Sequence, residues 1–221
     1  DIVPMRTSGG LDTVAIRMPS NPVAKALLEE VKLPIAAPSA NISGRPSPTK
    51  GIHVYHEMNN RVDGIIIGGD CTFGLESTVL DLTNDVPMIL RPGSITKEDL
   101  ENVIGHVNMD PALEKKEDNI KAKAPGMKYK HYSPNAEVFI VSGKTDDVAN
   151  KINELVDNNS KEGLKTVVMC LEDNKNKYNC DTIVLGENLE EVAMNLFSSL
   201  ISADEKEYDI VYSEEFPNKG I

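Results

Sequence analysis

The sequence has 221 residues, which is enough for one or two globular domains. Hydrophobic residues make up 40% and charged residues 26%, so collagen-like and intrinsically disordered compositions are excluded. No apolar run approaches the roughly 20 residues that a membrane-spanning helix needs, and residues 1–6 lack the basic start and apolar stretch of a secretory signal. The three cysteines, Cys71, Cys170 and Cys180, are too scattered for a disulfide framework, which predicts reduced thiols in a cytoplasmic protein.

The net charge of −12 is unevenly distributed along the chain. Residues 1–109 carry −4, residues 110–136 carry +2 and residues 137–221 carry −10. An acidic excess repels phosphodiester backbones, so the C-terminal part is expected to bind nucleic acid poorly. A local basic groove in the first part remains compatible with these totals.

The first 109 residues alternate short apolar runs with loops rich in glycine and proline, which predicts a mixed α/β domain. The apolar runs predict strands at 14–18, 35–37, 64–67, 77–82 and 87–90. The capping signals predict three helices: 22–31, with Asn21 as N-cap and Pro22 in the first position; one from Ser47-Pro48 to about Met58; and one capped by Thr96, with Asp99 near its third position.

From residue 137 onward, strands alternate with amphipathic helices, which predicts a small, parallel, Rossmann-like sheet. The predicted strands are 138–141, 166–171, 183–185 and 210–212. Thr145 is expected to cap a helix whose apolar face is Val148, Ile152, Leu155 and Val156, and a second helix follows over 189–200. Since no GxGxxG motif joins a strand to a helix, we predict no nucleotide site in this domain. Residues 110–136, between these two parts, are predicted to form a linker.

Three polar clusters in the first part are candidates for chemistry. Pro38–Gly44 follows an apolar run and combines hydroxyl, amide and glycine groups that suit a phosphate or carboxylate; the alternative is a turn that satisfies its own backbone. Residues 68–81 combine a glycine pair with Ser77 and Thr78, and the alternative here is a glycine-rich hairpin. Arg91 precedes a Pro-Gly turn, where it can bind an anion or form a surface ion pair.

Taken together, these clusters resemble a known family. Thr13-Val-Ala-Ile-Arg17-Met-Pro19, Ala37–Thr49, Gly74-Leu-Glu-Ser77-Thr-Val and Leu90-Arg91-Pro-Gly93 occur in the order and spacing of the YrdC-like L-threonylcarbamoyladenylate synthases. The run from Pro125 to Pro134 resembles the linker of the long form, which has an extra C-terminal domain. The resemblance implies an α/β fold: part of a mixed, twisted YrdC-like sheet domain over 1–109, a linker over 110–136 and the Rossmann-like domain over 137–221.

The resemblance also implies a nucleotidyltransferase reaction. L-threonine, bicarbonate and ATP, with Mg²⁺ on the phosphates, would give threonylcarbamoyl-AMP and pyrophosphate. Partner proteins would then use this intermediate to modify adenosine in tRNA to N6-threonylcarbamoyladenosine. The reaction would depend on positioning and charge stabilisation rather than on a covalent enzyme intermediate. No membrane partner is expected, and direct tRNA binding is left open.

The family's site residues carry over by matching motif. The residues expected to bind L-threonine are Arg17, Ala37 and Ser77. The residues expected to bind ATP are Thr13, Ser39, Ser47, Arg91, His131 and Tyr132. We further expect residues 129–132 to fold over the cleft as a lid, whereas Asn41 is a weaker candidate that braces its loop. No catalytic side chain and no protein metal site are predicted.

Family members carry an N-terminal half-domain, with a lysine and arginine pair, ahead of the first motif found here, and they continue into a further helix at the other end. We therefore expect this sequence to be a fragment that is inactive alone. Two other readings compete: an RNA-binding module without catalysis, and carbamoyl transfer as in hydrogenase maturation, which needs zinc-finger cysteines. His53 and His56 lie three apart on a predicted helix, where we expect a solvated face rather than a metal site.

Overall fold

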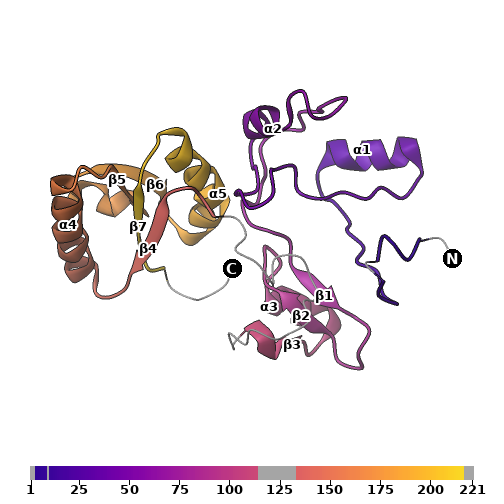
Figure 1. Cartoon of the computed structure of the whole chain (residues 1–221). Helices are drawn as coiled ribbons and strands as arrows, with labels where there is room; N and C mark the ends of the chain where they lie inside the picture. Colours follow the sequence, from indigo (N-terminus) through magenta and orange to yellow (C-terminus); the bar gives the residue numbers. More distant parts are fainter. Residues whose placement is uncertain (1–2, 9, 114–132, 217–221) are drawn as a thin grey trace.

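The computed structural model describes residues 3–8, 10–113 and 133–216, and they form two α/β regions (Figure 1). The first region carries helices α1 and α2, followed by a small mixed sheet with helix α3. The second is a parallel sheet with one long helix on each face. The predicted α/β class, with one mixed and one parallel sheet, is confirmed. The domain boundaries given above stay a prediction.

Helix α1 (Pro22–Val31) follows the sequence prediction at both its ends. The Asn21 side chain accepts hydrogen bonds from the backbone N–H groups of Val23 and Ala24, and proline occupies the first turn. The helix ends at Lys32, which takes a left-handed conformation with φ of 53°. α1 has no buried residue, so its caps and local bonds define it more than a core does.

The next two helices differ in how well their starts were predicted. α2 (Gly51–Met58) begins after Lys50, which supplies no side-chain cap, so the predicted start at Ser47-Pro48 is wrong. Ser47 is instead buried and bonded to a side chain outside the helix. α3 (Lys97–Ile104) confirms its prediction, because Thr96 and Asp99 form a complete capping box.

The sheet of the first region is smaller than predicted. β1 (Val79–Asp81) pairs antiparallel with β2 (Met88–Arg91), and β2 pairs in parallel with β3 (Asn108–Met109). The strands predicted at 14–18, 35–37 and 64–67 are wrong, because these segments form no strand and have no partner strand among the described residues. An apolar run indicates a segment that can be buried as a strand. A strand forms only where a second segment supplies partners for its backbone hydrogen bonds. Ile16 and Met18 are 85% and 92% exposed.

In the second region, all strand pairs of the sheet are parallel, as the alternating pattern predicts. The strands β4 (Glu137–Val141), β5 (Thr166–Leu171), β6 (Asp181–Gly186) and β7 (Ile210–Glu214) lie in the order β4-β7-β5-β6. Within the described ranges, short 3₁₀ helices occur at Pro111–Leu113, after β3, and at Glu172–Lys177, between β5 and β6. The sheet forms the base of a conventional two-sided core.

Helices α4 (Thr145–Lys161) and α5 (Leu189–Glu205) cover opposite faces of this sheet. On one face α4 packs against β5 and β7 through Val148, Ala149, Ile152 and Val156. On the other face α5 packs against β5, β6 and β7 through Val192, Phe197, Leu200 and Ala203. The predicted cap is wrong in one detail: Thr145 is the first helical residue, and Lys144 at the N-cap makes no side-chain bond.

The two regions touch through α5 and the start of the second domain. His56 Nδ1 of α2 lies 3.8 Å from Glu205 Oε1 of α5, and the backbone N–H of Ser133 donates to the carbonyl oxygen of Gly44 at 3.2 Å. All three cysteines are free thiols, as predicted. Among the described residues, the helices are too short or too polar to cross a bilayer.

Candidate functional site

Ser77 lies between two arginine side chains that come from distant parts of the sequence. Arg17, on the extended segment 14–18, and Arg91, at the end of β2, each place Nη2 3.4 Å from the Ser77 hydroxyl oxygen. Arg91 also donates from Nε and Nη2 to the Ser77 carbonyl oxygen, at 3.1 and 2.8 Å. This arrangement concentrates positive charge around one hydroxyl group in a protein whose net charge is −12.

The Glu76 side chain connects Ser47, which lies 29 residues earlier in the sequence, to the same cluster. The buried Ser47 hydroxyl donates to Glu76 Oε1 at 2.7 Å, and Glu76 Oε2 lies 3.7 Å from Arg91 Nη2. The side chains of Glu76 and Arg91 are 21% and 16% exposed. The cluster therefore joins the loop before α2, the loop before β1 and the end of β2 through contacts with the Glu76 carboxylate.

Two glycines make close backbone contacts around the Glu76–Thr78 segment, Gly93 with the segment itself and Gly74 with α5. A Cβ atom at Gly93 would lie 2.2 Å from the carbonyl oxygen of Glu76 and 2.4 Å from the Thr78 nitrogen. A Cβ atom at Gly74 would lie 1.9 Å from the carbonyl oxygen of Met194, on α5. Both positions therefore accept only glycine without backbone movement, and the second ties this loop to the C-terminal domain.

The Pro38–Gly44 loop is braced largely by its own polar groups. The Asn41 amide donates to the carbonyl oxygens of Ile42 and Arg45, each at 3.0 Å. Glu57, from α2, accepts from the Ile42 N–H at 3.1 Å and from Arg45 Nη1 at 2.8 Å. Burial raises the pKa of Glu57, but these bonds outweigh it and leave the pKa below its ordinary value. Asn41 thus acts as a loop brace, as expected.

The residues predicted from sequence divide into three groups. Arg17, Ser47, Ser77 and Arg91 lie together around Glu76. Thr13, Ala37 and Ser39 are exposed, and neither hydroxyl side chain hydrogen-bonds to any residue that the structure describes. His131, Tyr132 and the expected lid at 129–132 lie outside the described residues. The ligand roles given to all of them stay predictions.

Sequence reasoning missed the residues that organise the cluster. Glu76 stands inside the Gly74–Val79 motif and Glu57 lies on α2, yet neither was a candidate. The available signal for Glu76 was an acidic residue two positions after a glycine and directly before two hydroxyl residues. No comparable signal marked Glu57, because its partners lie 12 and 15 residues away.

The two histidines of α2 differ from the prediction and from each other. His56 is exposed and lies 3.8 Å from Glu205 of α5, whereas His53 is only 8% exposed, so the predicted solvated face is wrong for His53. Burial lowers the pKa of His53 despite the opposing field of Glu205. Among the described residues, no group of three His, Cys, Asp or Glu side chains could hold a metal ion.

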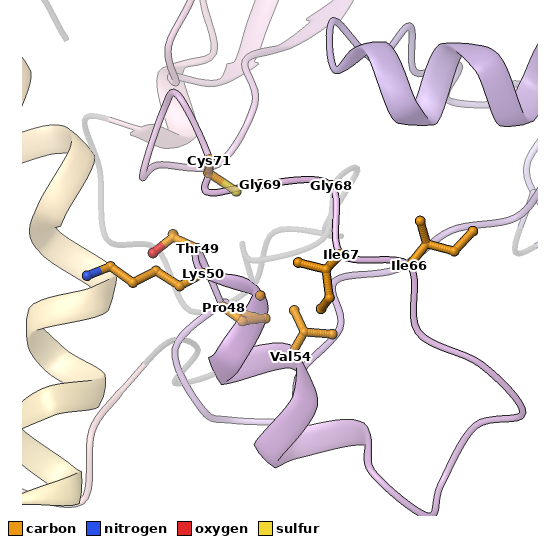
Figure 2. A pocket seen from close by; sticks show the side chains of 10 residues that line it. Pro48, Thr49, Lys50, Val54, Ile66, Ile67, Gly68, Gly69 and Cys71 are labelled. Carbon is orange, nitrogen blue, oxygen red and sulfur yellow. The ribbon is translucent and has the colours of Figure 1, made fainter.

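A small hollow lies beside the start of α2 (Figure 2). Its volume is about 90 Å³, and Thr49, Val54, Ile67 and Gly69 are among the residues that line it. Figure 2 shows that the Lys50 side chain extends away from the hollow, toward the pale yellow helix α5. Burial and the neighbouring Asp70 carboxylate raise the pKa of the Cys71 thiol at its rim. This small hollow is separate from the arginine cluster.

Two family models match the chain, one after the other. Residues 1–93 match the family of Sua5, YciO and YrdC, described as telomere recombination. Residues 95–221 match the family described as threonylcarbamoyl-AMP synthase, C-terminal domain. The second match covers more than half of the chain.

Relatives extend the similarity over the whole chain. The threonylcarbamoyl-AMP synthase of Pyrococcus abyssi is 45% identical over 222 residues, which is 100% of this chain and 64% of the relative. That of Bacillus subtilis is 43% identical over 100% of this chain and 63% of the relative. The crystal structure of P. abyssi Sua5 complexed with L-threonine superposes with a TM-score of 0.90 at 43% identity, covering 100% of this chain and 64% of that one. The chain thus spans a little under two thirds of these proteins.

Proposed function

Because the chain belongs to the threonylcarbamoyl-AMP synthase family, we propose that the protein makes L-threonylcarbamoyl-AMP and pyrophosphate from L-threonine, bicarbonate and ATP. The observation that carries the proposal is the meeting of Arg17 and Arg91 at the Ser77 hydroxyl, each at 3.4 Å. The substrates are a carboxylate and a triphosphate, and guanidinium groups bind both through paired, charge-assisted hydrogen bonds.

The reaction joins two anions, so the positive charge of the cluster is its main requirement. The threonine amine first condenses with bicarbonate, with loss of water, to give a carbamate. A carbamate oxygen then attacks the α-phosphorus of ATP, the bond between the α-phosphorus and the bridging oxygen to the β-phosphorus breaks, and pyrophosphate leaves. Holding both anions in place lowers the barrier by positioning and by stabilising charge that spreads over the phosphate oxygens.

Each residue of the cluster has a distinct part in this proposal. Arg17 binds the threonine carboxylate, with Ser77 at the same end of the substrate. Arg91 binds nucleotide phosphates, and Ser47 contacts the nucleotide. Mg²⁺ enters as part of the MgATP substrate, since the acidic side chain nearest the cluster, Glu76, is already bonded to Ser47 and Arg91.

The proposal places the protein in tRNA modification in the cytoplasm. The product is a reactive mixed anhydride, so a separate transfer protein must accept the threonylcarbamoyl group and pass it to adenosine in tRNA. An RNA-binding module without catalysis is the less supported function, because the net charge of −10 over residues 137–221 opposes phosphodiester binding by that part of the chain.

The decisive assay measures pyrophosphate release by the full-length protein. We expect release that requires L-threonine, bicarbonate and MgATP together and that stops when any one of them is left out. ATP turnover that ignores L-threonine, or salt-sensitive RNA binding with no response to L-threonine, would contradict the proposal.

A further inference from the structure

Glu76 connects two of the residues that the proposed function assigns to ATP. Its Oε1 accepts the Ser47 hydroxyl at 2.7 Å, and its Oε2 lies 3.7 Å from Arg91 Nη2. The three side chains come from separate segments: the loop before α2, the loop before β1 and the end of β2. A single carboxylate therefore fixes the spacing of two groups that the chain does not hold together locally.

The bond from Ser47 determines how this hydroxyl can meet a ligand. A serine hydroxyl has one proton to donate and two lone pairs that accept. With the proton donated to the carboxylate of Glu76, the lone pairs of Ser47 are what remains for a ligand. Ser47 is only 8% exposed, so its hydroxyl has little freedom to rotate away.

Glu76 is itself held in place by backbone contacts. A Cβ atom at Gly93 would lie only 2.2 Å from the carbonyl oxygen of Glu76, so the two backbones are in close contact. Gly74, two residues before Glu76, contacts the backbone of Met194 on α5. Arg91 donates twice to the carbonyl oxygen of the next residue, Ser77. A carboxylate on so constrained a backbone can orient its partners instead of following them.

We propose that Glu76 is a positioning residue for the nucleotide, which orients Ser47 and Arg91 without touching the substrate. This inference rests on the proposed function. It predicts that the charge of Glu76, and not only its volume, sets the affinity for ATP. L-threonine affinity depends on it less, because Arg17 has no contact with the Glu76 side chain within the described part of the chain.

The variant Glu76→Gln separates charge from shape. If its amide oxygen accepts from Ser47, its NH₂ group faces the Arg91 guanidinium, donor against donor. If the amide is reversed, its NH₂ group faces the Ser47 hydroxyl, and Ser47 must turn its proton away. Either orientation loses one of the two contacts, and hydrogen bonds to charged groups correspond to about ten- to a hundred-fold in affinity.

The experiment titrates MgATP and L-threonine separately into the wild-type protein and its variants. We expect Glu76→Gln to weaken ATP at least tenfold and L-threonine less than threefold. The matched control is Glu154→Gln, which removes an exposed carboxylate paired with Lys151 on α4 and leaves both affinities unchanged. Combined with Ser47→Ala, Glu76→Gln should cost less than the product of the two separate losses, since both act through one hydroxyl.

The outcomes separate this inference from the function on which it rests. A wild-type protein that binds neither ligand overturns the proposed function and this inference with it. A wild-type protein that binds both, beside a Glu76→Gln variant with unchanged ATP affinity, overturns this inference alone. If Glu76→Gln does not fold, Glu76→Asp decides, because it keeps the charge and withdraws it by one methylene. Weaker ATP binding with an unchanged unfolding midpoint supports positioning, and unchanged ATP binding overturns it.

Discussion

The two regions of the molecule are held together in different ways. In the C-terminal region, side chains such as Ile152, Val167 and Leu185 are completely buried on the two faces of a parallel sheet. In the first region, α1 has no buried residue, and the segments between helices are joined by bonds from Asn21, Glu57 and other polar side chains. The candidate site lies in the region with the smaller apolar core.

This difference indicates a division of labour. Loops that bind charged substrates expose polar groups, so they need a rigid support outside themselves. The C-terminal region supplies one such support, because Gly74, in the loop before β1, lies against the backbone of α5. The predictions below test whether stability and substrate binding divide between the regions in this way.

The largest contrast is expected from the same substitution in both regions. Ile152→Ala empties a fully buried site between α4 and the sheet and should lower the free energy of unfolding by about 2–5 kcal/mol. Ile16→Ala removes a side chain that is 85% exposed and should change it by no more than about 0.5 kcal/mol. Urea denaturation followed by circular dichroism measures both. Equal losses would contradict the contrast between the regions.

A smaller loss is expected where the regions meet. Gly74→Ala places a Cβ atom 1.9 Å from the Met194 carbonyl oxygen and should cost about 1–3 kcal/mol as loop and helix separate. Gly64→Ala is the matched control, because a Cβ atom there has no neighbour within 4 Å. Thermal unfolding compares the two variants. A Gly74→Ala protein as stable as the Gly64→Ala protein would show that the contact with α5 is dispensable.

How well the sequence predicts the fold also differs between the regions. Each strand of the C-terminal sheet was predictable from the sequence. The apolar residues that form the core there, such as Val148 of α4 and Val167 of β5, recur at helical or strand spacing within single short segments. In the first region the apolar runs at 14–18 and 64–67 form no strand and have no partner strand among the described residues. Strand pairing is a property of two segments, so one run of sequence cannot determine it.

The candidate site was predictable only in part, for a related reason. Motif order identified Arg17, Ser47, Ser77 and Arg91, which the fold does bring together. It could not identify Glu76 as their connector, because its role depends on the distance to a serine 29 residues earlier. The glycine requirements at Gly74 and Gly93 are likewise visible only once the backbone they touch is in place.

A local signal that the sequence did predict correctly should give a moderate effect. Thr96 and Asp99 form a capping box at the start of α3, so Thr96→Ala leaves an N–H group of the first turn without its acceptor. We expect a loss of about 1 kcal/mol in the free energy of unfolding. Thr96→Ser retains the hydroxyl oxygen and should lose much less, and a Ser variant as unstable as the Ala variant would argue against capping.

The smallest effect is expected from pH. Burial lowers the pKa of His53 below 6.5, so between its folded pKa and 6.5 the unfolded chain binds a proton that the folded protein does not. The contribution of His53 to stability is therefore constant above pH 6.5 and decreases as the pH falls below it. His53→Gln should flatten this part of the stability profile between pH 7 and 5. An unchanged slope in the variant would assign the dependence to other groups.

The central claim is that Arg17 and Arg91 bind the two anionic substrates, and calorimetric titration of Arg17→Ala and Arg91→Ala tests it most directly. We predict that Arg17→Ala weakens L-threonine and that Arg91→Ala weakens MgATP, each by about ten- to a hundred-fold. Each variant should bind the other substrate with an affinity close to that of the wild-type protein. If both variants bind both substrates as the wild type does, the arginine cluster around Ser77 is not the substrate site.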